Sequence, residues 1–307
     1  MEGLLPIWKE RGMTSHDCVF KLRKILNIKK IGHSGTLDPD VDGVLPVAIG
    51  KATKVIEYMV DSKKIYTGEI TLGFSTTTED SSGEIVEKKP VDINIDEDDI
   101  DNTLSEFIGV ITQTPPMYSA VKVNGRRLYE YARKGLVIER PSRKVTIYSF
   151  DRTSEVVRNI DQETLSFSFK VVCGKGTYVR TLAFDVGEKL ESPSHMSELT
   201  REASSGFKRE EALTLSEVQV LVDEERIEEA IFPLEKALSH MPSYELNPEE
   251  YIKVKDGSVL ERQAFLADDD EEIVFYYQEK AVAIYKIHPT KRQYIKPAKI
   301  LRNKLAV

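Results

Sequence analysis

Residues 32–49 read GHSGTLDPDVDGVLPVAI, and they divide into a loop and a strand. The first twelve residues, 32–43, are too rich in Gly, Asp and Pro to form regular structure, whereas the apolar run 44–49 predicts a strand. Pro39 disfavours the helical conformation at Asp38. The small residues Gly32, Ser34 and Gly35 would let a substrate approach the backbone closely. The loop is therefore the first candidate for chemistry, with Asp38 as the candidate carboxylate.

Three interpretations of this loop compete. Asp38, Asp40 and Asp42, followed by Gly43, fit the opening of a calcium-binding EF-hand loop. Ile49 occupies the position of the bidentate glutamate, however, so the main calcium anchor is missing. An Asp-Pro pair is also a common turn former. The loop alone does not decide between a plain turn and a catalytic carboxylate.

The charge of the chain is unevenly distributed. Its 307 residues carry a net charge of −8 with a pI near 5.4, which taken whole argues against a nucleic-acid binder. Three acidic stretches, Glu79–Glu106, Asp223–Glu229 and Asp268–Glu272, together hold −18, so the remainder holds +10. We therefore expect a two-faced electrostatic surface.

Two stretches are basic. Residues 117–147 carry eight basic side chains against two acids, and residues 286–304 carry seven Lys and Arg and no acid. Such runs are commonly just solvated surface. Tyrosines are interleaved with both, and arginine with aromatic side chains is the combination that binds RNA phosphates and bases. RNA recognition is thus a second interpretation of these runs.

Cysteine and histidine give no metal signal. Cys18 and Cys173 are far apart and no histidine pair has zinc-ligand spacing, so we expect neither a disulfide framework nor a zinc site. The first twelve residues lack a signal-peptide core, and no apolar run reaches the length of a membrane helix. The default expectation is a cytoplasmic protein.

Periodicity and turn signals predict a mixed, largely antiparallel α+β domain. Helices are expected from Thr14 to Asn27 and over 96–107, 127–134 and 177–190. Strands are expected over 44–49, 64–73, 119–123, 145–150 and 165–172, with a loop over 74–83. Pro242 and Pro248 follow a helical stretch, which places a boundary near residue 240. Strand-like runs at 273–277 and 281–287 then predict a small β-rich domain over 241–307.

Four motifs, in order along the chain, decide between these interpretations. They are residues 32–47, Tyr66 with Gly68 and Leu72-Gly73, the run QTPPMYSAVK at 113–122, and GKGTYVRT at 174–181. With these motifs, residues 1–240 resemble the TruB family of tRNA pseudouridine synthases. The tail from 241 resembles a PUA-type RNA-binding domain through 282–285 and 295–297.

The resemblance implies that a uridine in the T loop of tRNA, position 55, is flipped out and isomerised. It implies that Asp38 is the catalytic carboxylate, that Arg180 keeps it ionised, and that Tyr66 and Tyr178 contact the flipped base. His33 would fill the space left by the base, and Leu199 would form an apolar wall. Lys9 would contact the substrate, although Glu10 follows it where the family often has proline.

The resemblance also implies an inserted RNA-binding arm, in which Lys122, Arg126 and Arg127 would bind phosphates of the T stem. It implies a monomer acting on tRNA without metal, organic cofactor, membrane or obligate protein partner. Two alternatives remain: a non-catalytic protein that binds or folds tRNA, and a synthase subunit of a guide-RNA particle.

Overall fold

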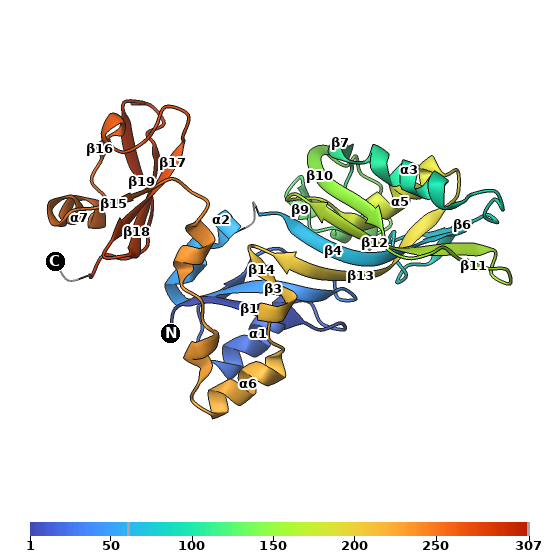
Figure 1. Ribbon diagram of the computed structural model, residues 1–307, viewed down its shortest axis with the longest axis horizontal. Coiled ribbons are helices and arrows are strands. Elements are labelled where there is room, and N and C mark those ends of the chain that lie inside the picture. The colour runs from blue at the N-terminus through green and yellow to red at the C-terminus, as the bar shows by residue number, and fades with distance from the viewer. Residues whose placement is uncertain (60–61, 306–307) are drawn as a thin grey trace.

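The computed structural model describes residues 1–59 and 62–305, and its larger part is built on one ten-stranded sheet (Figure 1). Along the main path the order is β1 (Gly3–Lys9), β3 (Asp42–Ile49), β13 (Ser194–Ser204), β4 (Lys64–Leu72), β12 (Thr164–Cys173), β10 (Arg143–Arg152) and β7 (Gly109–Gln113). Three short strands pair beside this path: β2 (Ile31–His33), β11 (Val157–Asn159) and β14 (Phe207–Lys208). Among the pairs of described strands in this sheet, only β3 and β13 run parallel. The predicted mixed, largely antiparallel fold is confirmed.

Alternation along β12 shows how the core under this part of the sheet forms. Leu165, Phe167, Phe169 and Val171 are each at most 1% exposed, while the intervening Ser166, Ser168 and Lys170 are partly or fully exposed. Successive side chains of a strand point to opposite faces, so one face of β12 is buried and the other reaches solvent. Its apolar face packs against β4, β10 and β13 in a single cluster.

Helices cover the sheet at two places. α3 (Glu97–Glu106) and α5 (Val179–Lys189) join the core of β12, whereas α1 (Ser15–Ile25) and α6 (Leu215–Asp223) pack with β1 and β3. The start of α1 is fixed by a capping box in which Thr14 and Asp17 bond each other's backbone N–H. A short helix, α2 (Ile56–Met59), precedes β4. Within the described residues, no helix is long and apolar enough to cross a membrane.

Two predicted loops contain short strands. The loop from residue 31 begins with β2, and the loop from residue 74 begins with β5 (Phe74–Thr76), which pairs with β6 (Ile85–Lys88). The strand predicted over 119–123 is wrong in its first part. The carbonyls of Ser119 and Val121 accept bonds from Tyr129 and Leu128, at the start of a helix, so they are not available to a strand ladder.

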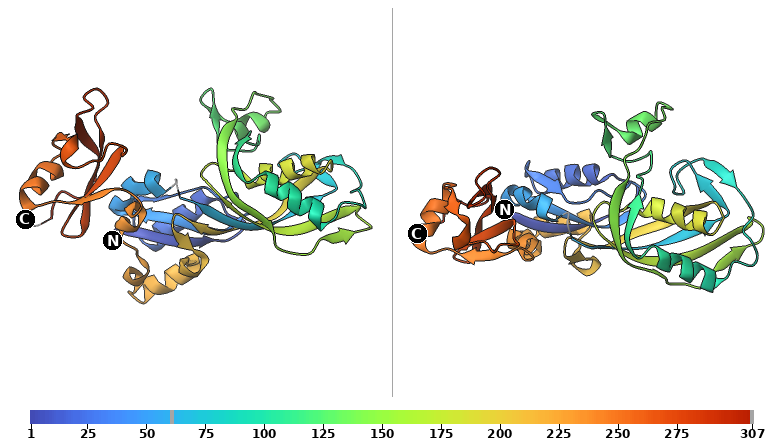
Figure 2. Two further views of the ribbon diagram at one scale, coloured as in Figure 1. Left: turned by 45° about the horizontal axis from the view of Figure 1, so that its top comes forward. Right: turned by 90° about the horizontal axis from the view of Figure 1, so that it is seen from above.

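An arm, residues 114–142, is inserted between β7 and β10. It contains the paired strands β8 (Lys122–Val123) and β9 (Arg126–Arg127) and the helix α4 (Leu128–Ala132). Figure 2 shows the arm rising away from the sheet. Leu128 is buried, whereas the side chains of Lys122, Arg126 and Arg127 are exposed. The arm therefore offers its basic side chains to solvent.

A second sheet follows Pro242. Its five strands have the order β15 (Ser243–Glu245), β17 (Glu272–Tyr277), β18 (Lys280–Ile287), β19 (Tyr294–Ile300) and β16 (Leu260–Glu261), with α7 (Pro248–Lys255) packed on it. β17 and β18 contain the two predicted C-terminal strands. Tyr251, Phe275 and Tyr285 form a core of their own.

The second sheet also packs against the first. Val274, Ala281 and Ile284 share a cluster with Leu4 and Val44 of the larger sheet. Two of the C-terminal basic side chains take part in this junction: Arg302 contacts Glu235 at 2.6 Å and Glu2 at 3.3 Å, and Lys299 contacts Glu57 at 2.7 Å. Some side chains of the C-terminal basic run therefore form ion pairs within the protein.

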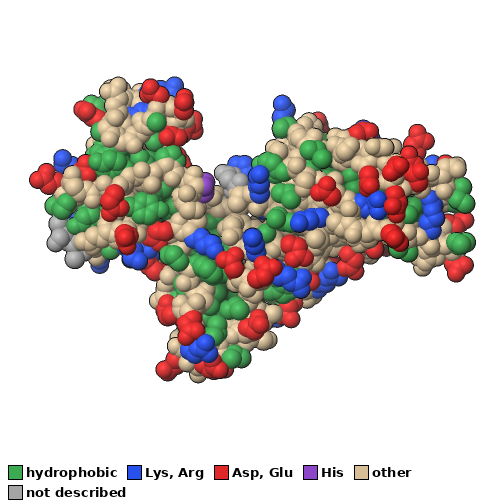
Figure 3. Space-filling model, viewed as in Figure 1, with side chains coloured by type: hydrophobic (Ala, Val, Ile, Leu, Met, Phe, Trp, Pro, Cys, Tyr) green, Lys and Arg blue, Asp and Glu red, His purple; other side chains and the backbone are tan. Residues whose placement is uncertain are grey.

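The charged surface differs from the expected two-faced pattern on the side that Figure 3 shows. Acidic and basic side chains are interspersed there over both sheets. Part of the reason is ion pairing across the acidic run: Arg152 contacts Asp101 at 2.9 Å and Glu97 at 3.2 Å. Two acids of this run are thus paired with an arginine from another segment of the chain.

Candidate active site

One pocket of about 260 Å³ lies where the Asp38 loop, residues 34–41, meets the sheet. Residues from six places line it: the Asp38 loop, β4, the arm, β10, the segment that leads into α5, and β13. It holds Asp38, Tyr66, Tyr178, Arg180 and Leu199, which the sequence placed far apart. The structure thus brings five of the predicted site residues together.

The Asp38 loop is held from both sides. Ser15 Oγ accepts a hydrogen bond from the Leu37 N–H at 2.9 Å and lies 3.2 Å from the Leu37 carbonyl oxygen. The carbonyl of Pro39, which directly follows Asp38, accepts a hydrogen bond from the Gly12 N–H at 2.9 Å. Gly35 has φ +72°, a conformation that favours glycine, so the chain can turn there. The backbone on either side of Asp38 is therefore fixed.

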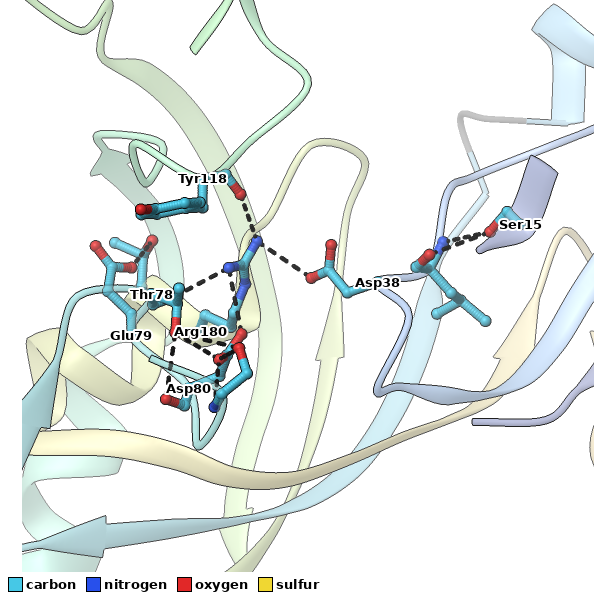
Figure 4. A network of polar contacts seen from close by, with 10 residues as sticks. Ser15, Asp38, Thr78, Glu79, Asp80, Tyr118 and Arg180 are labelled. Carbon is cyan, nitrogen blue, oxygen red and sulfur yellow. Dashed lines mark hydrogen bonds and ion pairs between the residues drawn. The ribbon is translucent and has the colours of Figure 1, made fainter. Parts of the chain in front are cut away.

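Arg180 faces Asp38 across the pocket (Figure 4). Its Nη2 lies 3.1 Å from Asp38 Oδ2, and its Nη1 lies 3.3 Å from Asp80 Oδ2. The guanidinium also donates to the carbonyl oxygens of Thr78 and Tyr118, each at 3.0 Å. Its side chain is 6% exposed, whereas that of Asp38 is 44% exposed. The arginine is thus anchored, and the carboxylate opens to the pocket.

Burial raises the pKa of the Asp38 carboxyl above its ordinary value, and Arg180 opposes that rise. Asp80 is held in turn by Thr78 Oγ at 2.6 Å and by the Ser82 N–H at 3.0 Å. It therefore orients the guanidinium on the side away from Asp38. The prediction that Arg180 is the cation beside Asp38 agrees with this geometry.

Tyr66 and Leu199 form an apolar part of the pocket. Their exposed fractions are 8% and 7%, and they lie on the adjacent strands β4 and β13. Burial raises the pKa of the Tyr66 hydroxyl, so this group is a neutral phenol near pH 7.

Tyr178 is placed at the entrance to α5 by Gln113. The Gln113 side chain accepts a bond from the Tyr178 N–H at 2.7 Å and donates to the Tyr178 carbonyl at 3.0 Å. The guanidinium of Arg143 lies 5.0 Å from the centre of the tyrosine ring, a cation–π distance. The ring is therefore held on the pocket rim by two segments that border the arm.

Comparisons with known proteins identify the family. Residues 23–179 match the TruB family pseudouridylate synthase N-terminal domain, and residues 180–239 match the tRNA pseudouridylate synthase B C-terminal domain. This chain belongs to the TruB family. A Bacillus pumilus (strain SAFR-032) protein named tRNA pseudouridine synthase B is 52% identical, covering 98% of each chain. Its namesake from Bacillus subtilis (strain 168) is 48% identical, covering 99% of each chain.

Solved structures show the same fold. A chain from a Cbf5–Nop10–Gar1 complex matches with a TM-score of 0.75 and 28% identity, covering 98% of this chain and 85% of that one. A chain from an H/ACA RNP bound to a substrate RNA containing 2′-deoxyuridine matches with a TM-score of 0.72 and 25% identity, with the same coverage. Membership of the TruB family makes this chain an enzyme, a pseudouridylate synthase.

Lys9 does not lie where a TruB substrate contact was expected, and this prediction is corrected. The residue is fully buried, and its ammonium donates to the carbonyls of Glu10, Met13 and Pro39 at 2.9, 2.7 and 3.2 Å. Three carbonyl acceptors use all three N–H groups of a lysine. Lys9 therefore ties the Asp38 loop to β1 and cannot reach RNA.

Four further predicted contacts lie outside the pocket lining. His33 is in β2 and partly buried, and its Nδ1 is buried without a hydrogen-bond partner among the residues that the structure describes. Burial lowers the pKa of His33. Lys122, Arg126 and Arg127 are on the arm. Their roles stay predictions, since a substrate would have to reach them beyond the pocket.

Sequence reasoning missed several residues around the pocket. Asp80 was counted in an acidic run, with nothing in the sequence to separate it from its neighbours. Arg201 lines the pocket two residues after Leu199 on the same strand, so a period of two would have placed both on one face. The calcium interpretation gains no support, because Asp42 accepts a bond from Thr200 Oγ at 2.6 Å and lies 3.7 Å from Arg11 Nε.

Proposed function

We propose that this enzyme isomerises a uridine in the T loop of tRNA, position 55, to pseudouridine. The observation that carries the proposal is the Asp38–Arg180 contact of 3.1 Å in a pocket lined by Tyr66, Tyr178 and Leu199. The names of the curated relatives, which are about half identical over nearly the whole chain, support tRNA as the substrate.

The proposed reaction breaks the bond between N1 and C1′, turns the base, and joins C5 to C1′. Cleavage leaves positive charge at C1′, and an ionised carboxylate can stabilise that charge, attack C1′ or take a proton from the sugar. Asp38 supplies the carboxylate in each of these routes. The C5 proton leaves after the new bond forms, and N1 gains a proton, so the product is an isomer of the substrate.

The target base must leave its stack before it reaches Asp38, at a cost of a few kcal/mol. Stacking on an aromatic ring returns about 1–3 kcal/mol per base, which Tyr66 and Tyr178 would supply. Leu199 closes the pocket wall, and His33 would occupy the position that the base vacates. The arm, through Lys122, Arg126 and Arg127, would bind phosphates of the T stem.

The rest of the proposed description follows the same resemblance. Residues 1–240 form the catalytic domain and residues 241–307 a PUA-like RNA-binding domain. The enzyme works as a monomer in the cytoplasm, without an obligate protein partner, a metal or an organic cofactor. The separate core around Tyr251, Phe275 and Tyr285 supports the division near residue 240.

The direct test compares Asp38→Asn with Asp40→Asn in a T-arm transcript. Asp40 is an exposed carboxylate two residues along the same loop, so its variant has the same change in charge without the contact to Arg180. We expect Asp38→Asn to form no pseudouridine while binding the transcript within a few fold, and Asp40→Asn to retain activity. Undiminished product from Asp38→Asn would refute the proposal and favour a protein that binds or folds tRNA.

The similarity to chains from Cbf5 and H/ACA complexes keeps a guide-RNA particle as the second candidate. The identity of 28% or less to those chains, against 52% to a bacterial synthase, favours the stand-alone enzyme. Activity of the purified chain on a transcript without any guide RNA separates the two.

A further inference from the structure

Arg201 is a buried cation that forms no ion pair with a carboxylate among the described residues. The residue is 1% exposed and lines the pocket from β13. The acceptors of its side-chain hydrogen bonds in that part of the chain are two backbone carbonyls. Arg180, in contrast, contacts two carboxylates. Burying a guanidinium whose acceptors are all neutral costs free energy of folding, so we expect this arginine to have a specific role.

The two carbonyls lie on either side of Asp38 in the sequence, one in the Asp38 loop and one in the strand that follows it. Arg201 Nη2 donates to the Gly35 carbonyl at 2.9 Å, and Nε donates to the Val44 carbonyl at 2.8 Å. Gly35 is three residues before Asp38, and Val44 is in β3, just after the loop. One planar group therefore holds the strand that follows the loop and the turn that begins it at a fixed separation.

The backbone of Arg201 closes against the same segment. Arg201 pairs with Gly43, and a Cβ at Gly43 would lie 2.3 Å from the Arg201 carbonyl oxygen. Gly43 therefore allows β13 to approach closely enough for the guanidinium to reach both carbonyls. The same side chain lies close enough to the Tyr66 hydroxyl to influence its pKa, and the backbone of Tyr66 pairs with Arg201 on the other side.

We propose that Arg201 is a positioning residue for the reaction, which fixes Asp38 and Tyr66 relative to each other. It does so because one guanidinium joins the turn that begins the Asp38 loop to the strand that follows it, while the backbone of Arg201 pairs with that of Tyr66. This inference rests on the proposed function, because it concerns the geometry in which the target uridine meets Asp38. Asp38 itself is not touched by Arg201, so the effect passes through the loop.

The test uses Arg201→Met, Arg201→Lys and a matched control, Arg152→Met. Arg152 is also largely buried, with 15% of its side chain exposed, and it pairs with Asp101 and Glu97 away from the pocket. Three quantities are measured: the single-turnover rate with saturating enzyme, the affinity for the T-arm transcript, and hydrogen exchange of the amides in residues 34–44.

Arg201→Met is expected to lower the single-turnover rate about a hundredfold, since small misplacements of reacting groups have effects of that size. Its affinity for the transcript should stay within about threefold, and exchange should accelerate in residues 34–44. Arg152→Met should lose stability while keeping both the rate and the exchange of that segment. A rate for Arg201→Met close to that of Arg152→Met would overturn the proposal.

Arg201→Lys provides the test if Arg201→Met does not fold. An ammonium keeps the charge but lacks the fork that spans the two carbonyls, so we expect a folded protein about tenfold slower. A rate equal to that of the unchanged enzyme would refute the positioning role. Hydrogen exchange is measured without substrate, so it tests the hold of Arg201 on residues 34–44 independently of the reaction. If the unchanged enzyme forms no product, the proposed function is refuted, and the exchange measurement still tests the role of Arg201.

Discussion

Arg180 Nη2 lies 3.1 Å from Asp38 Oδ2, and the two side chains differ sharply in freedom. The guanidinium is also bonded to Asp80 and to two carbonyl oxygens, so it cannot follow a moving partner. The carboxylate, 44% exposed, can leave the contact for a reacting sugar without breaking another side-chain hydrogen bond or ion pair among the described residues. The arginine therefore acts as a fixed positive charge toward which the reactive group is preorganised.

The first prediction concerns the pH dependence of this pair. Burial already raises the Asp38 pKa and Arg180 opposes the rise, so Arg180→Met should raise that pKa further. The ionised fraction of Asp38 then falls at a given acidic pH, and the acid limb of the pH–rate profile should move to higher pH. Arg180→Lys keeps a charge and should show a smaller displacement. An acid limb that stays in place in the methionine variant would mean that Asp38 ionisation does not control it.

Much of this site could be predicted from the sequence because its parts lie in short motifs. Asp38, Tyr66, Tyr178, Arg180 and Leu199 line one pocket, as the resemblance implied. Lys9 was misassigned because the sequence around a lysine does not indicate whether its ammonium meets RNA or backbone carbonyls. That distinction depends on how β1 packs against the Asp38 loop, a contact between segments thirty residues apart.

The distribution of charge on the surface could not be predicted for a related reason. Acidic and basic runs were treated as surfaces, but some of their members form ion pairs with side chains elsewhere in the chain, such as Asp101 with Arg152 and Arg302 with Glu235. Charge counted along the chain does not give its distribution in space. The arm was predicted better, because its basic side chains are local to one insertion and few of them find acidic partners.

The second prediction tests that arm. Arg126→Glu and Arg127→Glu should each weaken binding of the T-arm transcript and make its affinity less sensitive to salt, since fewer counterions are released. Lys170→Glu is the matched control: it reverses one exposed charge on β12, on the side of the strand away from the core. Salt titration of the dissociation constant measures both effects. Equal slopes for arm and control variants would show that the arm does not bind phosphate.

The third prediction concerns the junction between the two sheets. Arg302 and Glu235 are 2.6 Å apart with side chains only 11% and 16% exposed, and Glu235 also accepts the Ala281 N–H at 2.9 Å. Arg302→Met leaves Glu235 largely buried without its cation, which should cost about 2–4 kcal/mol in the free energy of unfolding. Arg226→Met breaks exposed pairs with Glu224 and Glu229 and should lower the free energy of unfolding far less. Urea unfolding measures both, and equal losses would mean that the junction adds no stability.

The fourth prediction concerns Asp185, a half-buried acid on α5. Burial, followed by the nearby Glu79 and Glu188, raises the pKa of Asp185 to about 6. The folded state therefore holds this proton more tightly than the unfolded chain does. The resulting stability is present below the unfolded pKa of about 4 and is lost as pH rises through about 6. The ionised carboxylate is thus an internal source of instability near neutral pH.

Asp185→Asn removes that ionisation while keeping the shape of the side chain. We expect it to raise the free energy of unfolding by about 2 kcal/mol at pH 8 and to leave it nearly unchanged at pH 4, where Asp185 is protonated. Glu188→Gln removes an exposed carboxylate on the same helix, the smallest of the three causes of the raised pKa, so it should give a much smaller gain at pH 8 and little change at pH 4. Thermal or urea unfolding at the two pH values measures the difference. A gain of the same size at pH 4 and pH 8 would show that the asparagine stabilises α5 by packing, and that Asp185 titrates normally.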